Sequence, residues 1–157
     1  MGTATAAEIE DRDKDPMFLD STPGYVSFTD AHVYNEAAFR QFLAADWARA
    51  ERLGRCLLLV LVSLRPESTQ PITLSRSVAA GVCRGLSASV REGDIVGWLR
   101  EGRVAAGLLV QGPRPPDTSA SAAIAARVGR AVGERLPSKL AGALRVRVHR
   151  LGASFLG

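Results

Sequence analysis

The sequence has few of the side chains that bind transition metals or act as strong nucleophiles. Only two cysteines and two histidines occur among its 157 residues. Cys56 and Cys83 lie in apolar segments, without the close spacing of a zinc site or the cysteine density of a disulfide-stapled fold. We therefore expect both thiols to be buried and reduced, and we expect no metal and no cofactor. His32 and His149 are far apart in the sequence, which favours ordinary surface or strand-edge histidines over a catalytic or metal-binding pair.

Long apolar runs are also missing. No stretch reaches the ~20 apolar residues that span a bilayer, and the N-terminus lacks the basic-then-apolar pattern of a signal peptide. Hydrophobic residues make up 46% of the chain, which is enough for one domain with a core of its own. The expectation is a cytoplasmic protein, or a piece of a longer one, with no membrane insertion.

Lysine is nearly absent, and the charges are unevenly distributed. All but two of the 20 basic residues are arginine. Residues 1–20 hold six acidic residues against Arg12 and Lys14, a net charge of −4, so the remaining residues carry +8. We interpret residues 1–24 as a disordered acidic tail or linker and residues 25–157 as the folded domain. Arginine suits phosphate groups, which indicates an anionic partner, although scattered arginines also simply solvate a surface.

Two segments in the first half of the domain have clear periodicity. Apolar residues recur at helical spacing over residues 35–53, with Asn35 as the N-cap and Gly54 as the stop. Residues 56–64 are almost continuously apolar and too short for a membrane span, which is typical of a central strand covered on both faces.

The second half of the domain alternates helical and strand patterns around a polar turn at residues 100–103. The predicted elements are a helix at 73–91 capped by Thr73 or Ser75, strands at 95–99 and 104–110, a helix from Ser119 or Ser121 to Leu136, and a strand at 143–150. Without the first helix this order is βαββαβ. The predicted fold class is therefore α+β, a ferredoxin-like sheet with an added N-terminal helix.

Several segments, in this order and spacing, resemble the GGDEF-type diguanylate cyclase domain, whose core is a βαββαβ sheet. Their positions are Asp20-Ser21-Thr22-Pro23-Gly24 with Asn35 and Phe39, then Leu43, Asp46, Arg49-Ala50, Arg52 and Gly54, then the strand 56–64, and finally Arg91-x-x-Asp94-Ile-Val-Gly with the strand 104–109. The resemblance covers roughly residues 20–152 and implies a nucleotide-cyclase-type core. It also implies that the family's later helix and last strand are missing at the C-terminal end.

The five signature positions of that family depart from its pattern. They fall here on Arg100, Glu101, Gly102, Arg103 and Val104. In active members the glycines let the nucleotide approach and the acidic residues hold two divalent metals, which need a fixed cluster of oxygen ligands. Arg103 stands where a carboxylate belongs, and the first strand ends without its metal-binding Asp. The resemblance therefore implies a degenerate domain without cyclase activity.

Arg91 and Asp94 match the family's inhibitory site for cyclic di-GMP, an Arg-x-x-Asp placed five residues before the signature. A guanidinium can fork onto a phosphate or a guanine edge, and a carboxylate can accept from guanine N–H groups. One hypothesis is therefore a non-catalytic signalling domain that binds cyclic di-GMP here and relays it to a partner. The alternative interpretation of the pair is an ordinary surface ion pair of small energy.

A second functional hypothesis needs no nucleotide. The strand 143–150 places Arg145 and Arg147 on one polar face, which would dock another protein or a second copy of the chain. Aromatic residues do not interleave with these arginines, so a stacking platform for nucleic acid is not indicated. Trp98 replaces a position that is usually Arg in the family, and we expect it to pack against the sheet or a protein partner.

Overall fold

The computed structural model describes residues 25–28, 31–66, 73–111 and 117–152. These residues form one six-stranded sheet with the order β2-β3-β5-β6-β4-β7. The strands are β2 (Tyr25–Phe28), β3 (Ala31–Tyr34), β4 (Cys56–Leu64), β5 (Ile95–Arg100), β6 (Val104–Val110) and β7 (Leu144–Gly152). The pairs β2–β3, β5–β6, β6–β4 and β4–β7 are antiparallel, whereas β3 lies parallel to β5. The predicted acidic tail, residues 1–24, lies outside the described residues.

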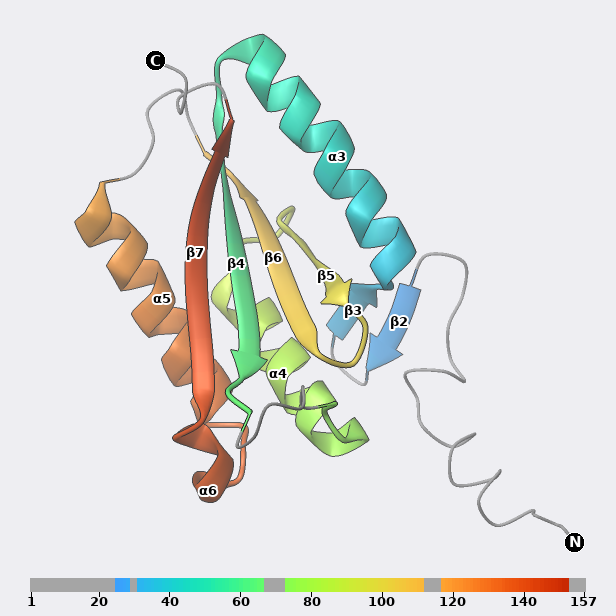
Figure 1. Ribbon diagram of the computed structural model, residues 1–157, viewed down its shortest axis with the longest axis vertical. Helices are drawn as coiled ribbons and strands as arrows, with labels where there is room; N and C mark the ends of the chain where they lie inside the picture. The colour runs from blue at the N-terminus through green and yellow to red at the C-terminus, as the bar shows by residue number, and fades with distance from the viewer. Residues whose placement is uncertain (1–24, 29–30, 67–72, 112–116, 153–157) are drawn as a thin grey trace, which may run out of the picture.

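Helices cover both faces of the sheet (Figure 1). They are α3 (Glu36–Leu53), α4 (Arg76–Ser89), α5 (Thr118–Gly133) and the single-turn α6 (Ser138–Ala141). The helices α4 and α5 pack on one face, and α3 crosses the other. The order β4-α4-β5-β6-α5-β7 confirms the predicted βαββαβ core with an added N-terminal helix.

Strand β4 is the centre of the fold. It pairs antiparallel with β6 on one edge and along its whole length with β7 on the other. Leu58, Val60 and Val62 face α4 and α5, whereas Leu57 and Leu59 face α3. Burying each of these side chains contributes ~1.5–3 kcal/mol. The continuous apolar run is therefore explained by a strand that has no solvent-facing side, as the sequence predicts.

Both ends of α3 are as predicted. The Oδ1 atom of Asn35 accepts a hydrogen bond from the backbone N–H of Ala38 at 2.9 Å. Gly54 ends the helix with φ of 67°, a left-handed conformation that costs glycine little.

The start of α5 corrects the prediction. Asp117, not Ser119 or Ser121, is the N-cap, and its Oδ1 accepts from the backbone N–H of Ala120 at 2.8 Å. A carboxylate is also favoured over a hydroxyl there by the positive end of the helix dipole. The helix ends at Gly133, earlier than predicted, and α6 follows separately. Helix α4 is shorter than predicted as well, beginning after Ser75, the cap, and ending at Ser89.

The hairpin of β2 and β3 is absent from the sequence prediction. Its register pairs Tyr25 with Tyr34, and Tyr34 in turn lies beside Gly97 of β5. The two strands are only four residues long each, below the length at which alternation is distinctive. Their enrichment in aromatic and β-branched residues was the available signal.

Two glycines of α4 allow it to pack closely against α5 and the turn that follows α5. A Cβ atom added at Gly85 would lie 2.6 Å from the Cα of Val132, and one at Gly81 would lie 2.6 Å from the carbonyl oxygen of Arg135. Both neighbours are backbone atoms, which cannot move aside as a flexible side chain does. The contact of α4 with α5, at Gly85, and with the following turn, at Gly81, therefore depends on the missing Cβ atoms.

We expect Gly85→Ala to lower the free energy of unfolding by ~1–3 kcal/mol, because the added methyl group overpacks the contact between α4 and α5. Urea denaturation monitored by circular dichroism measures the effect. Gly133→Ala is the matched control, since a Cβ there meets no atom within 4 Å. Equal stability of the two variants would contradict the close-packing account.

Candidate functional site

The tip of the β5–β6 hairpin is tied to the start of α3 by a reciprocal pair of hydrogen bonds. Glu101 Oε1 accepts from the backbone N–H of Glu36 at 3.1 Å, and Glu36 Oε1 accepts from the backbone N–H of Glu101 at 2.8 Å. The Glu101 carboxylate thus satisfies a free N–H at the positive end of α3. The hydrogen bond from the Glu101 backbone, assisted by Arg40 and Arg100, holds the pKa of Glu36 below its ordinary value of 4.5.

Two further contacts fix the hairpin tip. The backbone N–H of Leu74 donates to the carbonyl oxygen of Gly102 at 2.7 Å. Arg40 Nη2 donates to the carbonyl oxygen of Leu99 at 2.7 Å, while its Nε pairs with Glu36 at 3.1 Å. The tip is therefore held by α3 on one side and by the segment before α4 on the other.

The five signature positions occupy this fixed tip. Arg100 ends β5, Glu101, Gly102 and Arg103 form the turn, and Val104 begins β6. Within the described ranges, no three His, Cys, Asp or Glu side chains gather where they could hold a metal ion. The hollow beside the tip has a volume of about 360 Å³ and is lined by three arginines, which are Arg100, Arg103 and Arg145.

Arg91 and Asp94 lie together in the turn between α4 and β5. Asp94 Oδ2 accepts from the backbone N–H of Arg91 at 2.9 Å and lies 3.6 Å from the Arg91 Nε. The Asp94 side chain is only 7% exposed, whereas the Arg91 side chain is 69% exposed. The Asp94 carboxylate therefore holds the turn and the Arg91 side chain in place. The Arg91 guanidinium group remains largely exposed to solvent.

A second hollow, of about 430 Å³, opens beside this turn. Its lining includes Arg91 and Asp94, together with Ile124 and Arg127 from α5. The sequence prediction missed Arg127, although Ile124 and Arg127 are three residues apart and so share a face of that helix. Only the packing of α5 against the sheet brings Arg127 to Arg91.

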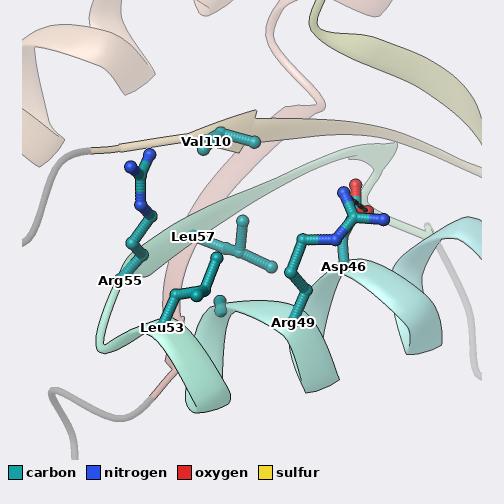
Figure 2. Close-up of a pocket in the computed structure, with 7 residues that line it drawn as sticks. Asp46, Arg49, Leu53, Arg55, Leu57 and Val110 are labelled. Atoms are coloured by element: carbon teal, nitrogen blue, oxygen red, sulfur yellow. Dashed lines mark ion pairs between the residues drawn. The ribbon is translucent and has the colours of Figure 1, made fainter.

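Val110 connects this hollow with a groove on the other face of the sheet. Its carbonyl oxygen accepts from Arg91 Nη2 at 3.0 Å. Its side chain points into the groove, where Leu53 of α3 and Leu57 of β4 face it (Figure 2). The ion pair between Arg49 and Asp46, 3.6 Å apart, flanks this apolar groove.

Large apolar side chains are exposed on α3 as well as in the groove. The predicted apolar stripe of this helix is only partly buried: Phe39 is fully covered, but Phe42 and Trp47 are 37% and 39% exposed. Leu53 and Val110 are 59% and 45% exposed. The C-terminal half of α3 and the end of β6 thus present large apolar side chains to solvent.

The remaining predicted residues are placed as follows. Arg145 and Arg147 are two residues apart on β7 and so lie on the same face of the sheet, opposite the core-packed Val146 and Val148. Arg147 is exposed, whereas Arg145 is partly buried beside the hairpin tip. Cys56 and Cys83 are buried free thiols, as expected. Trp98 is fully buried in the core between the sheet and α4. In the part of the chain that the structure describes, no helix has the length and apolarity to span a membrane.

We expect Glu36→Gln to flatten the pH dependence of stability. Because folding lowers the pKa of Glu36, this carboxylate stabilises the fold above pH 4.5 and loses that contribution as the pH falls through the lower folded-state pKa. As the pH is lowered from about 6 to about 3, the urea concentration at the unfolding midpoint should fall more steeply for the wild type than for Glu36→Gln. Glu51→Gln, an exposed substitution on the same helix, should keep the wild-type slope, and identical slopes for all three proteins would refute the assignment.

Comparison with solved structures identifies the architecture. The GGDEF domain of FimX from Pseudomonas aeruginosa has a TM-score of 0.58 at 15% identity, over 81% of this chain and 80% of that chain. The GGDEF domain of DgcB from Caulobacter crescentus, in complex with c-di-GMP, has a TM-score of 0.54 at 16% identity, over 76% and 72%. The diguanylate cyclase SiaD from Pseudomonas aeruginosa, in complex with its activator SiaC, has a TM-score of 0.55 at 19% identity, over 92% and 57%.

Comparison of the sequence with family models and with curated proteins finds no match. These three structural likenesses lie below 20% identity and therefore concern the fold. They agree with the sequence resemblance and with the βαββαβ order of β4 to β7. The chain has the fold of GGDEF domains.

Proposed function

We propose that this chain is a non-catalytic signalling domain that binds cyclic di-GMP in the hollow beside Arg91 and transmits its binding to a protein partner. The observation that carries the proposal is the meeting of Arg91 and Arg127, from two separate elements, around one hollow next to Asp94. Its volume of about 430 Å³ is in the range of small-molecule sites. The similar GGDEF domain of DgcB was solved with c-di-GMP.

The chemistry of the hollow suits a cyclic dinucleotide. The ligand carries two phosphate groups and two guanine edges, and guanidinium groups donate paired hydrogen bonds to either. Arg91 and Arg127 are both exposed and able to reorient. Asp94 acts as a positioning residue, since its buried carboxylate already accepts from the Arg91 backbone and pairs with the Arg91 side chain.

Arg91 also supplies a route from the ligand to a partner. A ligand that takes the Arg91 guanidinium competes with its hydrogen bond to the Val110 carbonyl oxygen. Val110 ends β6, and its side chain lines the apolar groove beside Leu53. Binding in the hollow would therefore alter the end of the strand that faces the groove (Figure 2).

A second candidate function is protein interaction without nucleotide. The exposed Leu53 and Val110 favour it, because they line one groove between α3 and β6, and exposed apolar patches mark interaction sites. SiaD, which has a similar fold, was solved in complex with an activator protein. Under this alternative, added nucleotide changes neither the mass of the protein in solution nor its melting temperature.

Titration with cyclic di-GMP tests the first proposal. We expect the ligand to raise the melting temperature of the wild type, since it binds the folded state. Arg91→Ala and Arg127→Ala should each weaken binding by roughly tenfold or more, because a hydrogen bond to a charged group contributes ~1.5–3 kcal/mol. Arg130→Ala removes an exposed arginine from α5 outside the hollow and should leave the affinity unchanged. A wild type that gives no heat in titration calorimetry would rule out the ligand, as would equal losses in all three variants.

We expect no diguanylate cyclase activity. Arginines line the hollow at the hairpin tip, and the carboxylate of Glu101 is engaged with the start of α3 rather than free to hold a metal. Incubation with GTP and Mg²⁺ or Mn²⁺, followed by chromatography of the products, measures this directly. Formation of cyclic dinucleotide that depends on Glu101, tested with Glu101→Gln, would overturn the non-catalytic assignment.

A further inference from the structure

Strand β7 forms one edge of the sheet (Figure 1). It pairs with β4 along its whole length, and no other strand of the described ranges lies beside it. The backbone N–H of Arg65 donates to the carbonyl oxygen of Ala143, and bonded and non-bonded pairs alternate along an antiparallel ladder. The even-numbered residues of β7, from 144 to 150, therefore point their backbone N–H and C=O groups away from β4, toward the outer edge.

The two faces of β7 carry different side chains. Val146 and Val148 pack against the core on the side of α4 and α5, although both remain partly exposed. Arg145, Arg147 and His149 lie on the opposite face, which α3 crosses. Among the described residues, none of these three forms an ion pair with Asp or Glu. The edge strand thus carries a row of two arginines and a histidine, spaced two residues apart.

A long edge strand with unpaired backbone groups is a template for another strand. A second β7 placed there would bring two such rows together, and like charges on opposing strands repel. The row instead suits a strand that has carboxylates at every second residue, since opposite charges across a strand pair stabilise it.

The chain's own sequence has a segment of that kind. Asp11, Asp13 and Asp15 alternate in the sequence, and Ile9 continues the series. In an extended conformation these four side chains share one face. One antiparallel register matches all four to the side chains on that face of β7, in the order Asp15–Arg145, Asp13–Arg147, Asp11–His149 and Ile9–Leu151.

The length of the chain decides which copy supplies this segment. The strand registers place Tyr25 level with Arg147, five strand positions apart. A strand added outside β7 would therefore lie about 29 Å from Tyr25, at ~4.8 Å per strand. Tyr25 follows Asp15 by ten residues, which reach at most about 35 Å when fully extended. Because helices cover both faces of the sheet in between, this link is too short to pass around them within one chain.

We propose that residues 9–15 of a second copy add to β7 as an antiparallel edge strand and so join two chains. Main-chain hydrogen bonds to the outward groups of β7 supply affinity in this mode of recognition, and the alternating side chains set the register. The contact uses neither the hollow beside Arg91 nor the apolar groove, so it is independent of the proposed cyclic di-GMP site.

Light scattering of the full chain over a range of concentrations tests this inference. We expect the wild type to reach the mass of two chains. Arg147→Glu and Asp13→Arg should each weaken association roughly tenfold, because each sets like charges opposite one another. The double variant restores an opposite pair and should associate within about threefold of the wild type. Arg52→Glu reverses an exposed charge on α3 and is the matched control, which should leave association unchanged.

Hydrogen exchange followed by NMR locates the contact. The outward amides of Val146 and Val148 should be protected in the associated wild type and exchange quickly in Arg147→Glu, whereas the amide of residue 147, bonded to β4, should be protected in both. Fast exchange of the two valine amides in the wild type, a monomeric mass at every concentration, or a double variant no better than the single ones would each overturn the proposal. A monomer with protected valine amides would also overturn it, because the edge would then be covered within one chain.

Discussion

Burial of β4 on both faces is the constraint on which the other elements depend. A strand that is bonded on both edges and apolar on both sides requires β6 and β7 beside it and helices above and below it. The glycine contact between α4 and α5 covers one face compactly, and α3 covers only part of the other. The incomplete cover by α3 leaves Leu53 and Val110 exposed at one end of the sheet.

The two arginine-lined hollows lie at opposite ends of β4. Gln111, which bonds to the first residue of β4, lines the hollow of Arg91, and Ser63 and Leu64 at the other end line the hollow of Arg103. A nine-residue strand rises by roughly 3.3 Å per residue, so the hollows are separated by most of the length of the sheet. The fold therefore keeps the hollow beside the apolar groove well apart from the hollow at the hairpin tip.

The hairpin tip shows how one acidic residue changes role with its surroundings. In an active GGDEF signature a carboxylate at this turn serves a metal, whereas Glu101 here caps α3 and exchanges hydrogen bonds with Glu36. These two hydrogen bonds fix the turn, while the side chains of Arg100 and Arg103 on either side of it are exposed. A stable turn and a positively charged hollow thus follow from the same pair of contacts.

The sequence by itself determined the elements whose signals are local: the buried run of β4, the Asn35 and Gly54 caps of α3, and the order βαββαβ. Capping and periodicity are properties of neighbouring residues, so they are legible without the fold. It also paired Arg91 with Asp94, three residues apart. Only the tertiary structure brought Arg127 to Arg91 and Arg145 to Arg103, and added the short β2–β3 hairpin beside β5. Those contacts join residues distant in sequence, and their geometry depends on how helices and strands pack rather than on any local pattern.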